Sequence, residues 1–121
     1  MDIHAYWEAV LKQDAELMRT FFYDTAVINW HNTSESFNLE EFITANCTYP
    51  GEWDGAVERI EKKDDLIITV THVFSRDKEQ SFHAISFIRV KDDRIVLVDE
   101  YWSDDGPAPA WRLEKRIGHL I

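Results

Sequence analysis

The amino-acid sequence predicts an α+β fold in which N-terminal helices pack on a curved antiparallel sheet around an apolar pocket. In the first half of the 121-residue chain, apolar residues recur at helical spacing. The second half contains four β-rich runs separated by short polar turns, and helices followed by strands are typical of this fold class. Apolar residues make up 45% of the chain, which is enough for one packed domain over residues 1–121.

Two N-terminal segments are predicted to be helical. Ile3, Tyr6 and Val10 lie three and four residues apart, which places them on one face of a helix. Asp14 can cap a second helical turn, in which Leu17 and later apolar residues continue the stripe. The two segments form either two helices or one bent helix.

A short strand and a third helix are predicted next. Residues 26–30 are rich in β-forming side chains. Asn38 followed by Glu41 has the spacing of a capping box, which opens a helix. Turn-forming residues at positions 49–51 end that helix.

The second half of the chain is predicted to form a four-stranded antiparallel meander. The connections between its β-rich runs are too short to contain crossover helices, so consecutive runs must pair as antiparallel neighbours. The runs comprise residues 56–62, 66–75, 80–91 and 94–103.

Two-residue turns set the expected register of this meander. A turn at residues 77–78 pairs His72 with His83, and a turn at residues 92–93 places His83 opposite Trp102. Because side chains alternate between the two faces of a strand, these turns predict which residues share one face. That face is expected to line the pocket and to carry Val70, His72, Phe74, His83, Ile85, Phe87, Val96, Val98, Glu100 and Trp102.

The opposite face of the sheet is expected to form a homodimer interface. Its apolar residues would make a large exposed patch in a monomer. The residues expected there are Thr69, Thr71, Ser86, Ile88, Val90, Ile95, Leu97, Asp99 and Tyr101. The C-terminal segment 111–121 is also rich in apolar residues, so we expect it to dock and not to be a solvated end.

Glu100, His72 and His83 are the candidate catalytic residues. A carboxylate on an apolar face is costly to bury, and burial raises its pKa toward the range useful for general acid–base catalysis. A neighbouring histidine could exchange protons with it. The structural alternative is an ion pair of Glu100 with Arg59 or Arg89, or solvent exposure at the mouth of the pocket.

Aromatic residues are the candidate ligand contacts, although each of them could equally serve as core packing. With the apolar residues of the predicted inner face, the expected ligand-binding set is Trp30, Tyr49, Trp53, Val70, Phe74, Ile85, Phe87, Val98, Trp102 and Tyr6.

No cofactor and no metal ion are expected. The sequence contains no phosphate-binding glycine loop, dinucleotide motif or zinc-binding cysteine pattern. Two histidines and Glu100 could in principle hold a divalent cation, but ligands on adjacent strands without a close motif are a weak signal. The acidic pairs at residues 64–65 and 92–93 lack the spacing of a calcium loop.

Charge and cysteine content limit the partners and the compartment. A net charge of −10 repels nucleic-acid phosphates and anionic membrane surfaces, so neither is an expected partner. The single cysteine, Cys47, cannot form an intrachain disulfide, which fits a reducing compartment. With no secretion signal or membrane-spanning segment evident, a cytoplasmic location is expected.

The order of elements resembles the nuclear transport factor 2-like (NTF2-like, or cystatin-like) superfamily, and within it the SnoaL-like group. The resemblance rests on residues 12–14 before two phenylalanines, the strand at residues 26–30, and the last hairpin at residues 86–103. It implies a cone whose mouth holds a hydrophobic ligand and a homodimer formed through the outer sheet face.

The same resemblance implies a role for Glu100, which matches an acidic residue that projects into the cone from the last strand in related enzymes. His72 stands at a position where the epoxide hydrolase pattern has an acidic residue, and Val70 stands where that pattern has an arginine. These two departures argue against epoxide hydrolysis.

Two classes of function follow from the sequence. The first is a cofactor-free enzyme that transfers protons on a small hydrophobic molecule, as an isomerase, cyclase, dehydratase or hydrolase. The second is a non-catalytic module that uses the same cavity for ligand binding or serves as a dimerising accessory protein.

Overall fold

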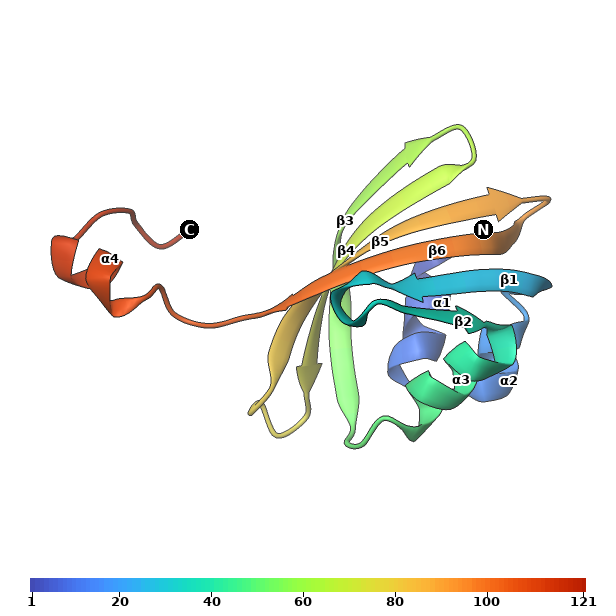
Figure 1. Ribbon diagram of the computed structural model, residues 1–121, viewed down its shortest axis with the longest axis horizontal. Helices are drawn as coiled ribbons and strands as arrows, with labels where there is room; N and C mark the ends of the chain where they lie inside the picture. Colours follow the sequence, from blue (N-terminus) through green and yellow to red (C-terminus); the bar gives the residue numbers. More distant parts are fainter.

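The computed structural model describes residues 1–121 and has the predicted α+β architecture (Figure 1). Three helices, six strands and one 3-10 turn form the domain, and a fourth helix lies beyond the last strand. In chain order these elements are α1 (Ile3–Leu11), α2 (Ala15–Arg19), β1 (Phe22–Trp30), η1 (His31–Thr33), β2 (Glu35–Asn38), α3 (Leu39–Thr48), β3 (Trp53–Lys63), β4 (Leu66–Ser75), β5 (Ser81–Lys91), β6 (Arg94–Asp104) and α4 (Ala110–Lys115).

The predicted helix caps are confirmed. The Asp14 side chain accepts a hydrogen bond from the backbone N–H of Leu17 at the start of α2. Asn38 and Glu41 form a reciprocal capping box at the start of α3. These caps satisfy backbone donors that the first helical turn leaves free. None of the helices is both long and apolar enough to cross a membrane.

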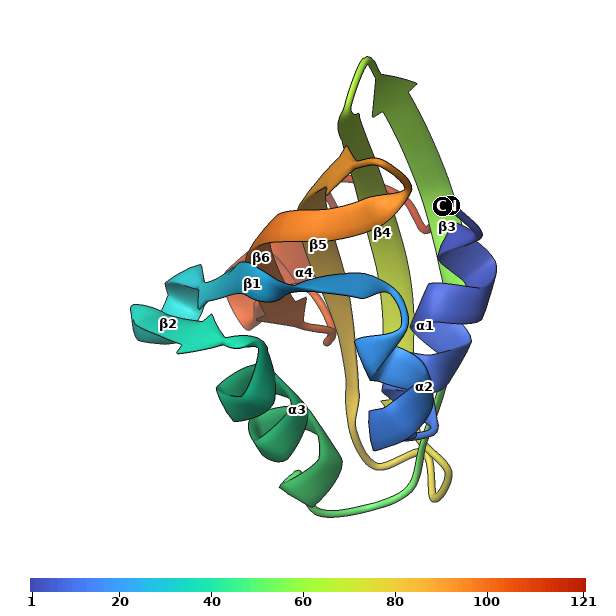
Figure 2. The same ribbon diagram turned by 90° about the vertical axis from the view of Figure 1, so that its right-hand side faces the viewer.

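The six strands form one curved sheet in the order β2-β1-β6-β5-β4-β3. The four strands β3 to β6 pair as antiparallel neighbours, as predicted. The sheet as a whole is mixed, however, because β1 pairs with β6 in parallel. This pairing is possible because the chain between them supplies a long crossover connection. Figure 2 shows α1 and α2 beside β3 and α3 below β1 and β2, so the helices frame the concave face.

The core fills the space between these helices and the concave face. Tyr6 of α1 is 1% exposed and packs edge-on against Phe21 and Phe22. Trp7 donates a hydrogen bond from Nε1 to Thr69 Oγ1 at 3.2 Å, which fixes α1 on the sheet. Buried polar groups need such partners, since an unpaired one costs about 1–3 kcal/mol.

A β-bulge in β6 reverses part of the predicted side-chain alternation. Both turns lie where expected, because Lys91 pairs with Arg94 and His72 pairs with His83. The register then shifts between Arg89 and Val90, so that β6 contains one residue more than β5 over this stretch. From there on, Glu100 pairs with Ser86 instead of Ile85.

The predicted face assignment of β4 and β5 is therefore wrong. The prediction placed these residues on the same face as Glu100. Because β6 contains one extra residue, the residues of β4 and β5 that were expected beside Glu100 lie on the opposite face of the sheet. The residues that lie on the outer face, against prediction, are Val70, His72, Phe74, His83, Ile85 and Phe87. Those predicted to be exposed in the dimer interface but found buried are Thr69, Thr71, Ser86, Ile88 and Ile95.

The C-terminal segment, which was predicted to dock, is instead exposed in this chain. Beyond β6 the chain leaves the domain as an extended arm that ends in α4 (Figure 1). Pro107 and Pro109 favour this extended backbone, because proline fixes φ and restricts the residue before it. The large apolar side chains of the arm are exposed: Trp111, Leu113, Ile117, Leu120 and Ile121.

Gly55 of β3 lies too close to the backbone of its neighbour β4 to carry a side chain. A Cβ at this position would lie 2.3 Å from the backbone oxygen of His72, so Gly55→Ala must push the strands apart. We expect a loss of about 1–3 kcal/mol in the free energy of unfolding, measured by urea denaturation. Gly106→Ala is the matched control, because no atom lies within 4 Å of its Cβ, and should change stability by less than about 0.5 kcal/mol. Equal stability of the two variants would contradict this account.

Candidate functional site

A cavity of about 440 Å³ opens between α1, α3 and the concave face of the sheet. Hydrophobic residues provide 11 of the 19 side chains that line it. Four of its lining residues are tryptophans, namely Trp7, Trp30, Trp53 and Trp102. The remaining lining residues are Val10, Leu11, Gln13, Phe42, Asn46, Tyr49, Val73, Glu79, Gln80, Ser81, Phe82, Ala84, Glu100, Asp104 and Asp105.

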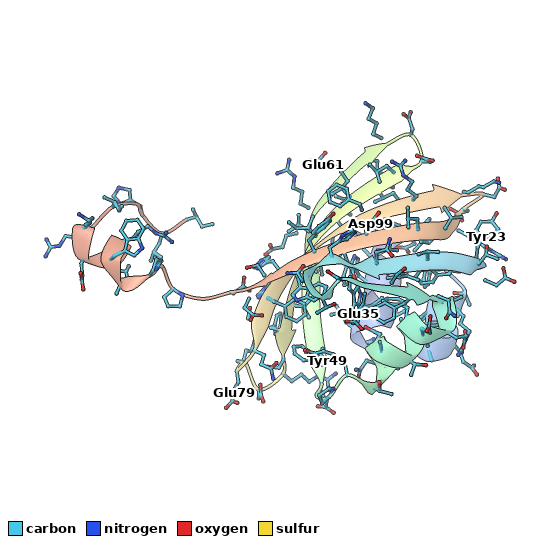
Figure 3. All side chains as sticks on the ribbon, in the orientation of Figure 1. Tyr23, Glu35, Tyr49, Glu61, Glu79 and Asp99 are labelled. Atoms are coloured by element: carbon cyan, nitrogen blue, oxygen red, sulfur yellow. The ribbon has the colours of Figure 1, made fainter.

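The end of α1 and the end of α3 are tied together beside the cavity. Gln13 Nε2 donates hydrogen bonds to the backbone oxygens of Asn46 and Tyr49, both at 2.8 Å. This link holds Tyr49 near Trp53, whose ring it meets edge-on at 5.6 Å. Tyr49 and Glu79 both lie at the end of the molecule that contains the β4–β5 turn (Figure 3).

Glu100 is the buried carboxylate of the cavity wall and is only 8% exposed. Its Oε2 accepts a hydrogen bond from Ser86 Oγ at 2.7 Å, and its Oε1 accepts one from Trp30 Nε1 at 3.1 Å. Burial raises the pKa of Glu100, and the two hydrogen bonds oppose this shift without cancelling it. The pKa of buried Tyr6 is also raised, mainly by burial and further by the charge of Glu100.

The predicted pairing of Glu100 with a histidine is wrong. His72 and His83 lie on the outer face, with their rings stacked at a centroid distance of 4.7 Å. The β-bulge is the reason, because it turns Glu100 inward while the histidine pair stays outside. No histidine lines the cavity.

The two histidines belong instead to an ion-pair network on the outer face. His83 shares hydrogen bonds with Asp105 at 2.6 Å through Nδ1 and with Glu58 at 2.9 Å through Nε2. The bond to Asp105 is the main cause of a raised pKa of His83. Ligand-type atoms of Glu58, His72 and His83 lie within 4.8 Å of one another, so these three residues could hold a divalent cation.

The structure divides the other predicted ligand contacts into three groups. Trp30, Tyr49, Trp53 and Trp102 line the cavity. Val98 and Tyr6 face inward but are buried in the core, with 0% and 1% of their surface exposed. The outer face carries the remaining four, which cannot contact a ligand in the cavity: Val70, Phe74, Ile85 and Phe87.

Sequence reasoning missed several residues of the site. Phe42, on the third predicted helix, was not among the expected ligand contacts, and Ser86 was placed on the outer face. A signal for the true inner face was present, since small residues alternate along β4 and β5 at Thr69, Thr71, Ala84 and Ser86. Small side chains on one face leave room for a cavity, whereas large ones would fill it.

Comparison with solved structures identifies the fold. An NTF2-like protein of unknown function from Burkholderia xenovorans has a TM-score of 0.80 and 21% identity, over 98% of this chain and 91% of that chain. A candidate ketosteroid isomerase from Kribbella flavida also has a TM-score of 0.80, with 16% identity over 98% of this chain and 86% of that chain.

A protein with a ketosteroid isomerase-like fold from Catenulispora acidiphila, solved with trimethylamine, has a TM-score of 0.72. It is 11% identical over 84% of each chain. Further neighbours include an epoxide hydrolase, a SnoaL-like polyketide cyclase candidate and a second polyketide cyclase candidate. No protein-family model and no curated protein matches the chain. The protein therefore has the NTF2-like fold found in the SnoaL-like group, and its site must be interpreted from its own residues.

Burial of Glu100 predicts a specific dependence of stability on pH. Its folded-state pKa lies above the ordinary value of 4.5, so the protonated form is favoured by folding. That contribution is present at low pH and is lost as the pH rises from 4.5 through the folded-state pKa. Glu100→Gln cannot ionise, so its stability relative to the wild type should increase over this range, by about 1.4 kcal/mol for each unit of pKa shift.

Urea denaturation between pH 4 and pH 8 measures this effect. Glu114→Gln, in the exposed helix α4, is the control and should follow the wild-type curve at every pH. Parallel pH profiles for the wild type and Glu100→Gln would show that burial does not perturb this carboxyl.

Proposed function

We propose that this protein binds a small hydrophobic molecule in the cavity and that Glu100 moves a proton to or from it without a cofactor. The observation that carries the proposal is a buried carboxylate, held by two neutral donors, in the wall of an aromatic cavity. A volume of about 440 Å³ lies within the usual range for small-molecule sites. The NTF2-like neighbours, which include isomerase, cyclase and hydrolase candidates, support this class of function.

The chemistry that fits best is isomerisation by a single proton shuttle. Glu100 is the cavity's buried acid–base group, and no histidine lines the wall to share its task. One carboxyl can remove a proton from one carbon of a substrate and return it to another, so it acts as base and then as acid. Hydrolysis would need a second group to position water. Ser86 and Trp30 would hold the carboxylate in place during both steps.

A non-catalytic binding module is the alternative function. The same arrangement supports it, because a cavity with a single buried charged group can recognise a ligand without transforming it. The other lining acids, Glu79, Asp104 and Asp105, are exposed, so the cavity has no second buried acid–base group, and this observation favours the alternative.

We also propose that two copies associate through the outer face of the sheet. The interface residues differ from those expected from the sequence, because the β-bulge in β6 changes which residues of β4 and β5 lie on that face. Ile85 and Tyr101 are 41% and 43% exposed there, and they pair across β5 and β6. The exposed arm adds further apolar surface that a second copy could cover. The single cysteine is compatible with the reducing cytoplasm, which we propose as the location. The proposed interface comprises Leu66, Ile68, Val70, Phe74, Ile85, Phe87, Val96, Leu97 and Tyr101.

Deuterium exchange tests the proposed proton transfer. A hydrophobic β,γ-unsaturated ketone in D₂O should incorporate deuterium next to its carbonyl group in the presence of the protein, as followed by NMR. Glu100→Gln should lower the exchange rate by ~10²-fold, the usual scale for a positioned acid or base. Glu61→Gln, which changes an exposed residue of β3, should leave the rate unchanged. Exchange no faster than in buffer would contradict the catalytic proposal and leave the binding module.

Sedimentation velocity tests the proposed dimer. The wild-type protein should sediment as a dimer at micromolar concentration, whereas Ile85→Glu should sediment as a monomer because it places a charge in the apolar interface. Leu17→Glu is the matched control, since Leu17 is 44% exposed but lies on α2, away from the sheet face. Equal dissociation of both variants, or a wild-type monomer, would contradict the proposed interface.

A further inference from the structure

The charge of the cavity has one sign. Every charged side chain that lines it is an acid, and the lining contains no lysine, arginine or histidine. Glu100 lies within the wall, while Glu79, Asp104 and Asp105 come from the β4–β5 turn and from the end of β6. The protein as a whole also carries a net charge of −10. An anionic ligand would therefore meet repulsion at the cavity mouth and find no cation inside.

The basic residues near the lining acids are engaged outside the cavity: His83 pairs with Asp105 from the outer face, and the β4–β5 turn contains Arg76 and Lys78. Arg76 lies 3.4 Å from Glu52 and 3.5 Å from Asp54, in exposed ion pairs. Lys78 places its ammonium group 4.6 Å from the ring centroid of Phe74, on the outer face. Neither residue lines the cavity, so neither neutralises Glu100.

Glu100 itself has no cationic partner. Its two oxygens accept hydrogen bonds from a serine hydroxyl and an indole N–H, which are both neutral. A buried carboxylate is usually paired with a positive charge, because desolvation without such a partner costs several kcal/mol. A cation brought by the ligand would supply the missing partner and would stabilise the ionised carboxylate.

Aromatic rings around this carboxylate suit a positive charge. Trp30 meets Trp102 at a centroid distance of 5.7 Å and Phe42 at 6.2 Å, with interplanar angles of 81° and 84°. Edge-to-face packing turns ring faces in different directions, which is how aromatic cages surround an ammonium group. A second cluster, Trp53 with Tyr49 and Phe82, lines the same cavity.

From these observations we infer that the ligand is a hydrophobic amine, protonated or quaternary, whose positive charge lies between Glu100 and the aromatic rings. The inference rests on the ligand-binding part of the proposed function and specifies its ligand class; with the ammonium group paired to it, Glu100 acts as a counter-ion, as in the binding-module alternative. The ammonium group pairs with Glu100 and contacts the rings of Trp30 and Trp102, while the apolar remainder extends toward Trp53 and Tyr49. The acidic mouth attracts such a ligand and repels carboxylates and phosphates.

A pair of isosteric probes tests the charge requirement. Phenyltrimethylammonium and tert-butylbenzene have nearly the same shape, but only the first carries a positive charge. Titrations monitored by tryptophan fluorescence and by NMR should show that the cation binds at least ~10-fold more tightly, since cation–π contacts and a buried ion pair act only on it. The affinity for the cation should also fall as salt is added.

Single substitutions in the full-length protein show which residues are responsible for the preference for the cationic probe. Glu100→Gln should weaken binding of the cationic probe by ~10-fold or more and change the affinity for the neutral probe by less than about 3-fold, because only the ion pair is lost. Trp102→Leu should likewise weaken the cation more than the neutral probe, which keeps the test valid if Glu100→Gln folds poorly. Glu61→Gln changes an exposed glutamate of β3 outside the cavity and should leave both affinities unchanged.

The outcomes separate this inference from the proposed function. Equal affinities for the two probes, or a cation affinity that neither Glu100→Gln nor Trp102→Leu reduces, would overturn the amine inference and leave a cavity for neutral ligands. Tighter binding of the neutral probe would overturn it as well. If neither these probes nor a neutral hydrophobic dye occupies the cavity, the proposed ligand-binding function itself fails.

Discussion

One extra residue in β6 sets the character of the site. The bulge opposite Arg89 brings Glu100 into register with Ser86, and both side chains then face the concave side of the sheet. Without it, strict alternation would place Glu100 in line with the histidine pair and away from its serine. The cavity would then lose its buried carboxylate together with Trp102, which lies two residues further along β6 on the same face. Both the proposed proton transfer and the inferred ligand charge depend on this local irregularity.

Small and large side chains occupy different parts of the cavity's surroundings. The inner face of the sheet carries a row of small residues, of which Ala84 lines the cavity, whereas the helices and strand ends contribute large aromatic rings to its wall. The polar members of the row differ in their bonding: Thr69 accepts from Trp7, Ser86 donates to Glu100, and Thr71 Oγ1 is buried without a partner. Polar atoms on the sheet are thus used to anchor a helix and to orient the carboxylate.

The two faces of the sheet have separate roles in this account. The concave face carries the cavity, and the convex face carries an apolar surface with an ion-pair network at one side. Asp105 links them, because it lines the cavity and also bonds His83 outside. The arm begins at this residue, so the chain segment offered to a second copy starts beside the ligand site.

The sequence by itself determined the fold class, the helix caps, the order of the strands β3 to β6 and both hairpin turns. These features depend on local periodicity and on turn and cap chemistry, which act over a few residues. It also identified Glu100 and four aromatic residues that lie around the cavity. The resemblance carried by the last hairpin indicated the NTF2-like fold that the solved structures share.

Only the tertiary structure decided which side chains of each strand face the cavity and which lie on the outer face of the sheet. A bulge adds one residue to one strand, and residues 94–98 contain no glycine or proline to mark its position. A single-residue shift moves a whole face, so the histidines and four predicted ligand contacts were assigned to the wrong side. The parallel pairing of β1 with β6 and the exposed arm are likewise long-range outcomes. They depend on where distant segments meet in space, which local sequence patterns do not encode.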